Sequence, residues 1–388
     1  MRDVITELEA WWRAGDSVGV GTVVATWKSS PRQPGAAMLV GPDGAAVGSV
    51  SGGCVEGAVY ELAAESRLDG RAVLQRYGVS DDDAFAVGLT CGGIIDVFVE
   101  QVDQQTFPEL GAVADDIREG RPVAVATLVT DVEGGDRVGR RLVLRDGITT
   151  GSFGSDRLDT AVHDDVLGML EQGRTGIVRY GPDGERRGDD IAVFVAAYAP
   201  RPRMIVFGAI DFAAAVARVG SFLGYRVTVC DARPTFATIR RFPDADEVVV
   251  EWPHRYLEKS YENDEIDSRT VVCVLTHDPK FDVPLLELAL RMPLAYVGAM
   301  GSRRTNEDRS ARLRELGLTD EELSRLHAPI GLDVGARTPE ETAVSVAAEI
   351  ISLRWGGSGA QLRRTSGPIH HDVSAPAAAP ALLEDSSS

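Results

Sequence analysis

The feature that most constrains the fold of this 388-residue chain is an alternation of short apolar segments and helical segments in its second half. The apolar segments are rich in strand-forming residues and comprise residues 203–207, 225–230, 247–251, 271–275 and 295–298. Segments with helical periodicity, such as residues 208–223 and 282–291, lie between them. Strands that alternate with helices pair in parallel through βαβ units, so this half predicts a Rossmann-like, doubly wound parallel sheet.

The first turn of this expected sheet carries part of a dinucleotide-binding pattern. Gly208 follows the first strand, and Asp231 ends the second strand, about 20 residues further on, where a ribose-binding acid belongs. Ile210 replaces the second glycine of the pattern, and its side chain crowds the approach of a pyrophosphate. We therefore expect Gly208, Asp211 and Asp231 to lie at a nucleotide-type site. Its ligand is either NAD(P) or a group placed differently over the same strand ends.

Further polar residues follow the later strands. His277 comes after the fourth strand, and Arg303 and Arg304 come after the fifth, directly behind Gly301 and Ser302. Because parallel strands end at one edge of the sheet, these side chains are expected to converge there. A glycine and a serine at a helix start, with two arginines, predict a phosphate site. The alternatives are a strand-end histidine bonded to its neighbours and a solvated turn that bears both arginines.

The first half of the chain predicts an α+β domain. Glycine-punctuated strands run from residue 18 to about 100, and the turn at residues 41–44 predicts a hairpin. Pro200 and Pro202 interrupt regular structure and mark the expected linker. The predicted division is residues 1–199 as the N-terminal α+β domain, with a subdivision near residue 102 as an option, residues 200–356 as the Rossmann-like domain, and residues 357–388 as a disordered tail rich in Ala, Pro and Ser.

Two cysteines lie in glycine-rich settings that look functional. Cys54 follows Gly52 and Gly53, and Cys91 precedes Gly92 and Gly93. Glycine neighbours leave the backbone uncrowded, so a bulky ligand can approach each thiol. Helical periodicity after Cys54 places this thiol at a helix start, where the dipole and free N–H groups favour a thiolate. Cys230 and Cys273, by contrast, lie inside apolar strands and are expected to be buried.

Composition narrows the choice of function. A net charge of −19 argues against nucleic-acid binding, which depends on neutralising phosphates. No segment predicts a membrane span, and the N-terminus lacks the pattern of a secretory signal, so we expect a cytoplasmic protein without a membrane partner. Four cysteines without close pairing fit a reducing compartment. Motifs of zinc proteases, α/β-hydrolases and P-loop proteins are missing from the sequence, which removes support for those classes.

Several long motifs resemble one family. In the first half they are Ser-Pro-Arg-Gln-Pro-Gly at residues 30–35, Gly-Ser-Val-Ser-Gly-Gly-Cys-Val-Glu at residues 48–56 and Gly-Leu-Thr-Cys-Gly-Gly at residues 88–93. In the second half they include Val-Gly-Ala-Met-Gly-Ser-Arg-Arg-Thr at residues 297–305 and Gly-Leu-Asp-Val-Gly-Ala-Arg-Thr-Pro-Glu-Glu at residues 331–341. Over nearly the whole chain before the tail, the sequence resembles the XdhC/CoxI family, accessory factors of xanthine dehydrogenase and related molybdenum hydroxylases.

The resemblance implies an accessory factor rather than the oxidoreductase itself. Such a protein binds the molybdenum cofactor, as molybdopterin or its dinucleotide form, shelters it while a sulfido ligand is installed, and delivers it to an apo-hydroxylase. Cys54 and Cys91 then become the expected contacts to molybdenum, and Arg32, Arg303 and Arg304 the expected partners of phosphate. The expected protein partners are a cysteine desulfurase-type sulfur donor, a second copy of the chain and the hydroxylase apo-subunit. The Rossmann-like domain holds either the cofactor nucleotide or NAD(P).

Two other functions stay open on the sequence. An NAD(P)-dependent oxidoreductase is supported by the alternating strands and by Asp231, although a hydride-transfer constellation is not recognisable. A thiol redox sensor requires Cys54 and Cys91 to approach within disulfide distance. The hydroxylase itself is excluded, because the chain lacks an iron–sulfur cysteine run and is too short for the catalytic domains.

Overall fold

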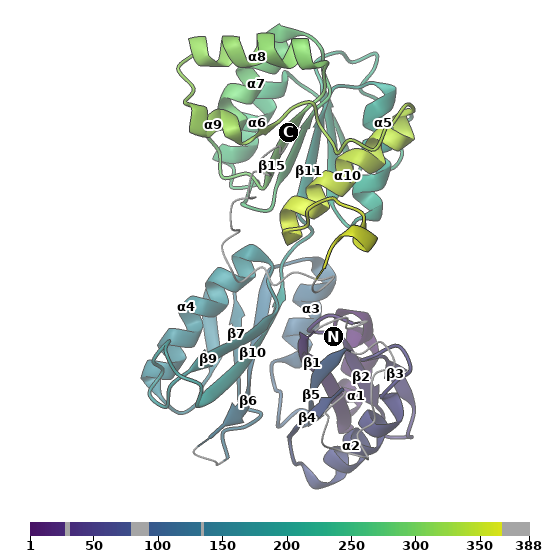
Figure 1. Cartoon of the computed structure of the whole chain (residues 1–388). Coiled ribbons are helices and arrows are strands. Elements are labelled where there is room, and N and C mark those ends of the chain that lie inside the picture. Colours follow the sequence, from purple (N-terminus) through teal and green to yellow (C-terminus); the bar gives the residue numbers. More distant parts are fainter. Residues whose placement is uncertain (28–31, 79–92, 133–135, 367–388) are drawn as a thin grey trace, which may run out of the picture. The chain divides into compact units, whose positions relative to one another are not determined.

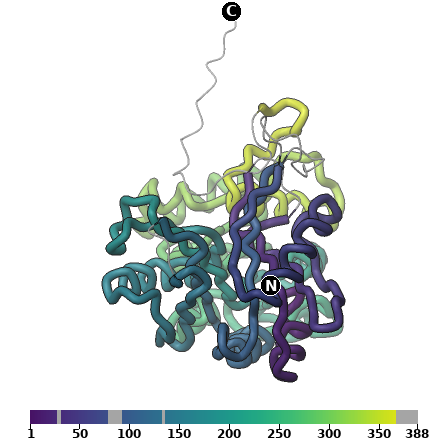
Figure 2. The backbone as a smooth tube through the Cα atoms, turned by 90° about the horizontal axis from the view of Figure 1, so that it is seen from below, coloured from purple at the N-terminus to yellow at the C-terminus, as the bar shows by residue number. Residues whose placement is uncertain are grey.

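The computed structural model describes residues 1–27, 32–78, 93–132 and 136–366. The chain divides into two compact units, the first from Met1 to Pro200 and the second from Arg201 onward. Figure 1 labels the elements of both units, and Figure 2 follows the same backbone as a tube. Each unit is described by itself below.

The second unit is built on a six-stranded parallel sheet. Its strands lie in the order β13 (Glu247–Val250), β12 (Arg226–Asp231), β11 (Arg203–Phe207), β14 (Val271–Val274), β15 (Tyr296–Ala299) and β16 (Leu326–His327). Every neighbouring pair is parallel. The chain starts at β11, moves outward to β13 and then returns to β14, so the strand order reverses between β11 and β14. This is the doubly wound order of a Rossmann fold and confirms the predicted fold class.

Helices cover both faces of this sheet (Figure 1). One face packs against α5 (Asp211–Phe222) and α10 (Pro339–Trp355), and the other against α6 (Pro253–Glu262), α7 (Pro279–Ala289) and α8 (Arg303–Glu315). Cys273 lies in the first of these two cores and Cys230 in the second, both fully buried as predicted. A short helix, α9 (Asp320–Ser324), precedes β16.

The helix α10 begins at a capping box. The Thr338 hydroxyl accepts the Glu341 N–H, and the Glu341 carboxylate accepts the Thr338 N–H, which satisfies two amides at the helix start. Gly356 ends α10 in a left-handed conformation. Residues 357–366 include a short 3₁₀ helix, Leu362–Arg364, whereas the rest of the predicted tail lies outside the described residues.

The first unit contains two antiparallel five-stranded sheets. The first sheet has the order β3 (Ala46–Gly48), β2 (Ala37–Val40), β1 (Val18–Trp27), β5 (Ile94–Val102) and β4 (Val73–Tyr77), and β2 and β3 form the predicted hairpin. The helix α2 (Glu56–Asp69) packs directly on β1. A Cβ at Gly19 would lie 2.0 Å from the Ala63 carbonyl oxygen, and one at Gly21 would lie 2.6 Å from Val59, so glycine at both positions permits this close approach.

The second sheet has the order β8 (Ile148–Gly151), β7 (Arg141–Arg145), β6 (Val123–Asp131), β10 (Ile191–Tyr198) and β9 (Gly176–Tyr180). The helix α4 (Asp156–Gln172) covers one face of this sheet through Leu158, Val162 and Val166. Its opposite face shares a core with the first sheet and with the helices α1 (Ile5–Ala14) and α3 (Leu110–Glu119). The two sheets therefore form one folded unit.

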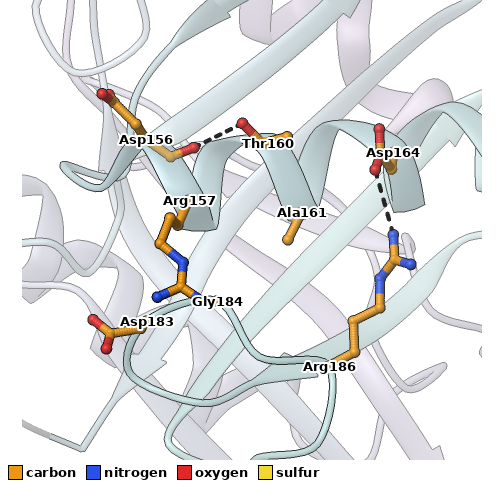
Figure 3. A pocket seen from close by; sticks show the side chains of 8 residues that line it. All are labelled: Asp156, Arg157, Thr160, Ala161, Asp164, Asp183, Gly184 and Arg186. Atoms are coloured by element: carbon orange, nitrogen blue, oxygen red, sulfur yellow. Dashed lines mark hydrogen bonds and ion pairs between the residues drawn. The ribbon is translucent and has the colours of Figure 1, made fainter.

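A hollow of about 510 Å³ lies beside α4 (Figure 3). It is lined by Asp156, Arg157, Thr160, Ala161 and Asp164 of α4 and by Asp183, Gly184 and Arg186 of the following hairpin. Arg186 pairs with Asp164 at 3.6 Å, and the Thr160 hydroxyl donates to the Asp156 carbonyl at 2.8 Å. None of the residues singled out from the sequence lines this hollow.

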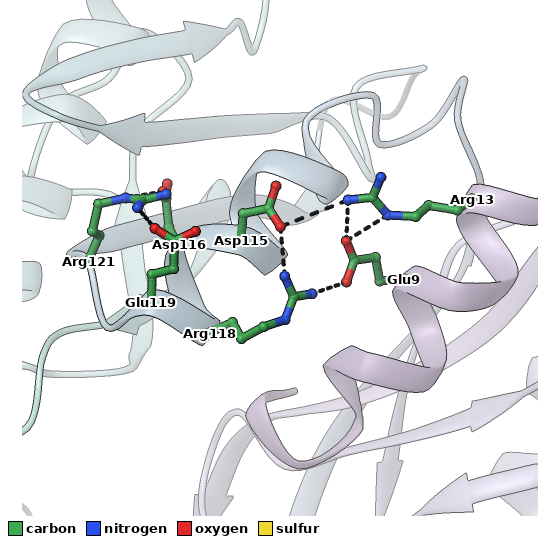
Figure 4. A network of polar contacts seen from close by, with 7 residues as sticks. All are labelled: Glu9, Arg13, Asp115, Asp116, Arg118, Glu119 and Arg121. Atoms are coloured by element: carbon green, nitrogen blue, oxygen red, sulfur yellow. Dashed lines mark hydrogen bonds and ion pairs between the residues drawn. The ribbon is translucent and has the colours of Figure 1, made fainter.

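Ion pairs tie α1 to α3 (Figure 4). Glu9, whose side chain is 7% exposed, accepts from Arg13 at 2.8 Å and also pairs with Arg118 of α3. Arg118 in turn pairs with Asp115 at 2.7 Å. A charged network around a buried carboxylate fixes the relative position of two helices more strongly than isolated surface pairs do.

A second buried pair links the two sheets. Arg141 of β7 contacts Glu100 of β5 at 2.5 Å, and both side chains are less than 10% exposed. The same guanidinium lies 4.6 Å from the ring centre of Phe107 and donates to the Thr106 carbonyl at 2.9 Å.

No helix in the described part of the chain is long and apolar enough to span a bilayer.

Candidate functional site

The Cys54 loop, residues 49–55, lies between β3 and α2. The helix begins at Glu56 with Val55 as its N-cap residue, so Cys54 comes immediately before the cap. Gly52 and Gly53 have φ values of 80° and 118°, and a Cβ at either residue would meet no atom within 4 Å. Cys54 itself is partly buried against the apolar cluster under α2. The glycines thus form an open surface loop next to a thiol, as the sequence predicts.

The centre of this loop is a carboxylate to which the sequence analysis gave no role. Glu56 Oε1 accepts from the Ser49 hydroxyl at 2.7 Å and from the Ser51 and Gly52 N–H groups at 2.9 Å. Its other oxygen, Oε2, accepts from the Ser51 hydroxyl at 2.5 Å, the Gly53 N–H at 2.8 Å and the Val55 N–H at 3.2 Å. The loop is therefore wrapped around a side chain of the helix that follows it.

The predicted helix start is present at Glu56, and the Gly53 and Val55 amides that precede it donate to the Glu56 carboxylate. Burial alone would raise the pKa of Glu56, yet the hydrogen bonds from Ser51, Ser49 and the backbone lower it to about 2. The loop before α2 is therefore organised around a carboxylate that is ionised at neutral pH.

Other parts of the predicted sulfur site are only partly described. Cys91 and Gly92 lie outside the described residues, so the distance between the two thiols and the redox-sensor hypothesis stay untested. Gly93 is buried just before β5, and Arg32 is exposed. Within the described ranges, no group of three or more His, Cys, Asp or Glu side chains could hold a metal ion.

The Gly208 turn, residues 208–211, connects β11 to α5. Gly208 has a φ of 113°, and a Cβ there would lie 3.0 Å from the Thr276 backbone nitrogen. The Leu275 N–H donates to the Phe207 carbonyl at 2.8 Å, which holds the ends of β11 and β14 together. Glycine at position 208 is therefore required by close packing at the point where the strand order reverses.

Asp231 lies beside this turn, and its carboxylate accepts hydrogen bonds from neighbouring residues of the chain. One carboxylate oxygen accepts from the Ala209 N–H at 2.7 Å and from Arg233 Nη2 at 2.8 Å. The other accepts from the N–H and Nε of Arg233, both at 2.9 Å. Burial would raise the pKa of Asp231, and the bonds from Arg233 and Ala209 lower it below its ordinary value. A ribose hydroxyl would therefore compete with Arg233 for this carboxylate.

The start of α5 also departs from a dinucleotide site. Asp211 occupies the first helical position, where an incoming pyrophosphate would meet its negative charge. Its carboxylate pairs with Arg241 at 3.2 Å, and Arg241 also donates to the Ala209 carbonyl at 3.3 Å. With Ile210 in place of the second glycine, these residues do not fit NAD(P) in the ordinary Rossmann mode.

The turn after β15 is better suited to an anion. Ser302 caps α8 by accepting the Thr305 N–H at 3.1 Å. Arg303 and Arg304 are exposed, and neither their amides nor their guanidinium groups have a hydrogen-bond or ion-pair partner among the residues that the structure describes. His277 is exposed after β14, as the sequence suggests for a residue at a strand end.

A buried network beneath this turn was not predicted. Arg309, 4% exposed, pairs with Asp282 at 2.9 Å and donates to the Met300 carbonyl at 2.9 Å. Asp282 also accepts from the Thr276 hydroxyl, and the backbone nitrogen of Thr276 lies against Gly208. Burial raises the pKa of Asp282, and Thr276 and Arg309 oppose that shift. The network connects the turns after β11, β14 and β15 at one edge of the sheet.

Taken together, the fold and the Cys54 loop define a two-unit protein in which a sheet-rich unit with a glycine-flanked thiol precedes a Rossmann unit. Residues 204–350 match the family model of the XdhC Rossmann domain, and residues 11–78 and 116–181 match that of the XdhC and CoxI family. The chain therefore belongs to the XdhC/CoxI family.

Individual relatives cover nearly the whole chain. A Bacillus subtilis protein, named as a probable xanthine dehydrogenase subunit, is 28% identical over 90% of this chain and 97% of its own length. The molybdenum cofactor insertion chaperone PaoD of Escherichia coli is 26% identical over 88% of this chain and 85% of its own length. A crystal structure described as a xanthine dehydrogenase from Bacillus halodurans has a TM-score of 0.62 and 28% identity, and the match covers 90% of this chain and 95% of that one.

Proposed function

We propose that this protein is an accessory factor that binds the molybdenum cofactor, protects it and delivers it to a molybdenum hydroxylase of the xanthine dehydrogenase type. The observation that carries the proposal is the Cys54 loop, in which a partly exposed thiol lies beside two glycines without side-chain cover. Membership of the XdhC/CoxI family, and a relative named as a cofactor insertion chaperone, support the same role.

In this proposal the cofactor is cargo, and the side chains of the chain hold it. Cys54 and Cys91 supply soft sulfur ligands to molybdenum. Arg303 and Arg304, with Arg32, neutralise phosphate of the pterin or of its dinucleotide form. Delivery requires the apo-hydroxylase as a partner, and sulfuration requires a cysteine desulfurase-type donor. We further propose that the protein acts in the cytoplasm as a dimer of two copies of this chain.

The test is cofactor retention after co-expression with the enzymes of cofactor biosynthesis. Cys54→Ala and Cys91→Ala should each retain at least about tenfold less molybdenum and pterin per chain, a loss that corresponds to about 1.4 kcal/mol of binding free energy. Cys230→Ala is the matched control, because this thiol is buried inside the second unit and should not contact the cargo. Parental retention in both Cys54→Ala and Cys91→Ala would reject the ligand role.

An NAD(P)-dependent oxidoreductase is the second candidate, because the strand order reverses at a point where such proteins bind their nucleotide. The bonds that Arg233 and Ala209 already make to Asp231 count against this function, because a ribose hydroxyl would have to compete with them. Fluorescence titration with NADH and NADPH separates the two functions. Tight binding together with turnover of a carbonyl substrate would favour the oxidoreductase.

A further inference from the structure

We propose that Glu56 is a positioning residue whose carboxylate holds the Cys54 loop in the conformation that presents the thiol to the cargo. This inference rests on the proposed function, in which Cys54 contacts molybdenum. It adds a residue that acts through Cys54 rather than on the cofactor.

The first argument is the number of donors that converge on one side chain. Six hydrogen bonds from the loop end on Glu56, three on each carboxylate oxygen. Glu56 is the first residue of α2, and this helix is anchored in the core by Val59 and Ala63, both fully buried. The carboxylate therefore transmits the position of a rigid helix to a loop that precedes it in the chain.

The second argument is the lack of side-chain packing at the glycines. Gly52 and Gly53 have no side chains, and the positions of their missing Cβ atoms are open to solvent. Their N–H groups donate to Glu56, and the Gly52 N–H also donates to the Ser49 hydroxyl at 3.0 Å. Glycine is the residue that loses most backbone freedom on folding, so a stretch of this kind needs a strong acceptor to stay in one conformation.

A short relay extends the hold of Glu56 to Cys54 itself. The Ser51 hydroxyl donates to Glu56 and accepts the Cys54 N–H at 2.9 Å and the Val55 N–H at 3.1 Å. Without the carboxylate, the Ser51 hydroxyl loses its acceptor and is free to rotate. Its hydrogen bond with the Cys54 N–H is then no longer held in place.

The test combines alkylation of Cys54 with retention of the cargo. Glu56→Gln keeps the length of the side chain but replaces one acceptor oxygen by an NH₂ group, so three of the six donors lose their partner. We expect iodoacetamide to modify Cys54 about three- to tenfold faster in Glu56→Gln, measured on the Cys54 peptide by mass spectrometry, and cofactor retention to fall about tenfold. Glu56→Asp keeps the charge on a shorter side chain. Its alkylation rate and its cofactor retention should both lie between those of the parent and those of Glu56→Gln.

Asp159→Asn is the matched control. Asp159 lies in the first turn of α4 and accepts the Phe153 N–H at 2.8 Å and the Ser152 hydroxyl at 2.6 Å, so it also holds a loop in the first unit. Its variant should lower the melting temperature without changing Cys54 alkylation or cargo retention. Such a result separates positioning of the thiol from a general loss of stability.

The outcomes distinguish the inference from the function on which it rests. If Glu56→Gln is alkylated at the parental rate and keeps its cargo while Cys54→Ala loses the cargo, the positioning role is overturned and the ligand role stands. If Cys54→Ala keeps the cargo while Glu56→Gln still accelerates alkylation, the hold on the loop stands and the ligand role fails. Equal effects of Glu56→Gln and Asp159→Asn on alkylation would also overturn the positioning role.

Discussion

Replacement of Asp231 should destabilise the Rossmann unit, because its carboxylate is a structural partner of the Gly208 turn. In Asp231→Ala the Ala209 N–H, on a residue 1% exposed, loses its acceptor, which costs about 1–3 kcal/mol. Loss of the pair with Arg233, whose side chain is 48% exposed, adds at most about 1 kcal/mol. We therefore expect a loss of about 1–4 kcal/mol for Asp231→Ala. Asp231→Asn should lose about half as much, since it keeps one acceptor oxygen.

Two assays on the full chain measure this prediction. Urea unfolding gives the free-energy change of the Rossmann transition, and hydrogen–deuterium exchange reports on the peptide around Ala209, which should lose protection. Asp211→Ala is the control, because its side chain is 87% exposed and its removal should cost less than about 0.5 kcal/mol. The reasoning is refuted if Asp231→Ala unfolds at the parental urea concentration but loses NADH binding, since Asp231 would then serve a ribose instead of the turn.

Three further predictions concern Glu56, Arg309 and Gly208. Glu56→Gln should destabilise the first unit by about 1–2 kcal/mol at pH 7. A pKa lowered from 4.5 to about 2 corresponds to about 3 kcal/mol, which solvent screening reduces at this partly exposed site. This stabilisation is present above pH 4.5 and is lost as the pH falls toward 2, so in acid unfolding the difference in stability between Glu56→Gln and the parent should vanish near pH 2. Arg309→Met should lower the free energy of unfolding by about 3–5 kcal/mol, because it leaves Asp282 buried without its partner. The double variant Arg309→Met with Asp282→Leu should recover most of that loss in urea unfolding. A double variant no more stable than Arg309→Met would contradict the coupling. Gly208→Ala should lower the free energy of unfolding by about 1–3 kcal/mol, because the new methyl group meets the Thr276 backbone at a left-handed φ, and unchanged thermal unfolding would show that the turn can relax.

The parallel sheet could be predicted because its signals are local. Apolar strands such as residues 203–207 and 271–275 alternate with helices, and the handedness and pairing of βαβ units leave few topologies. The helix α8 carried a weaker signal. Its inward face consists of Asn306, Arg309 and Leu313, so two of its three buried residues are polar and hydrophobic periodicity is lost.

The site was harder to predict, because several of its contacts replace the expected partner by one from the chain itself. Asp231 stands at the position of a ribose-binding acid, but Arg233 occupies it from only two residues away. Glu56 was visible in the Gly-Gly-Cys-Val-Glu motif, yet its fold back onto the loop depends on backbone angles that a sequence pattern does not report. A run of glycine amides next to a carboxylate is the signal that would have indicated it.

The core shared by the two antiparallel sheets has a consequence for biosynthesis. Val20 and Phe98 of the first sheet pack in one cluster with Val125 and Phe194 of the second, and Phe194 belongs to the last strand of the unit. During synthesis on the ribosome, the earlier strands therefore expose their apolar faces to water until that last strand has been made. Holdase chaperones should therefore bind the nascent chain before the second sheet is complete. A fragment that ends between the two sheets should aggregate into inclusion bodies.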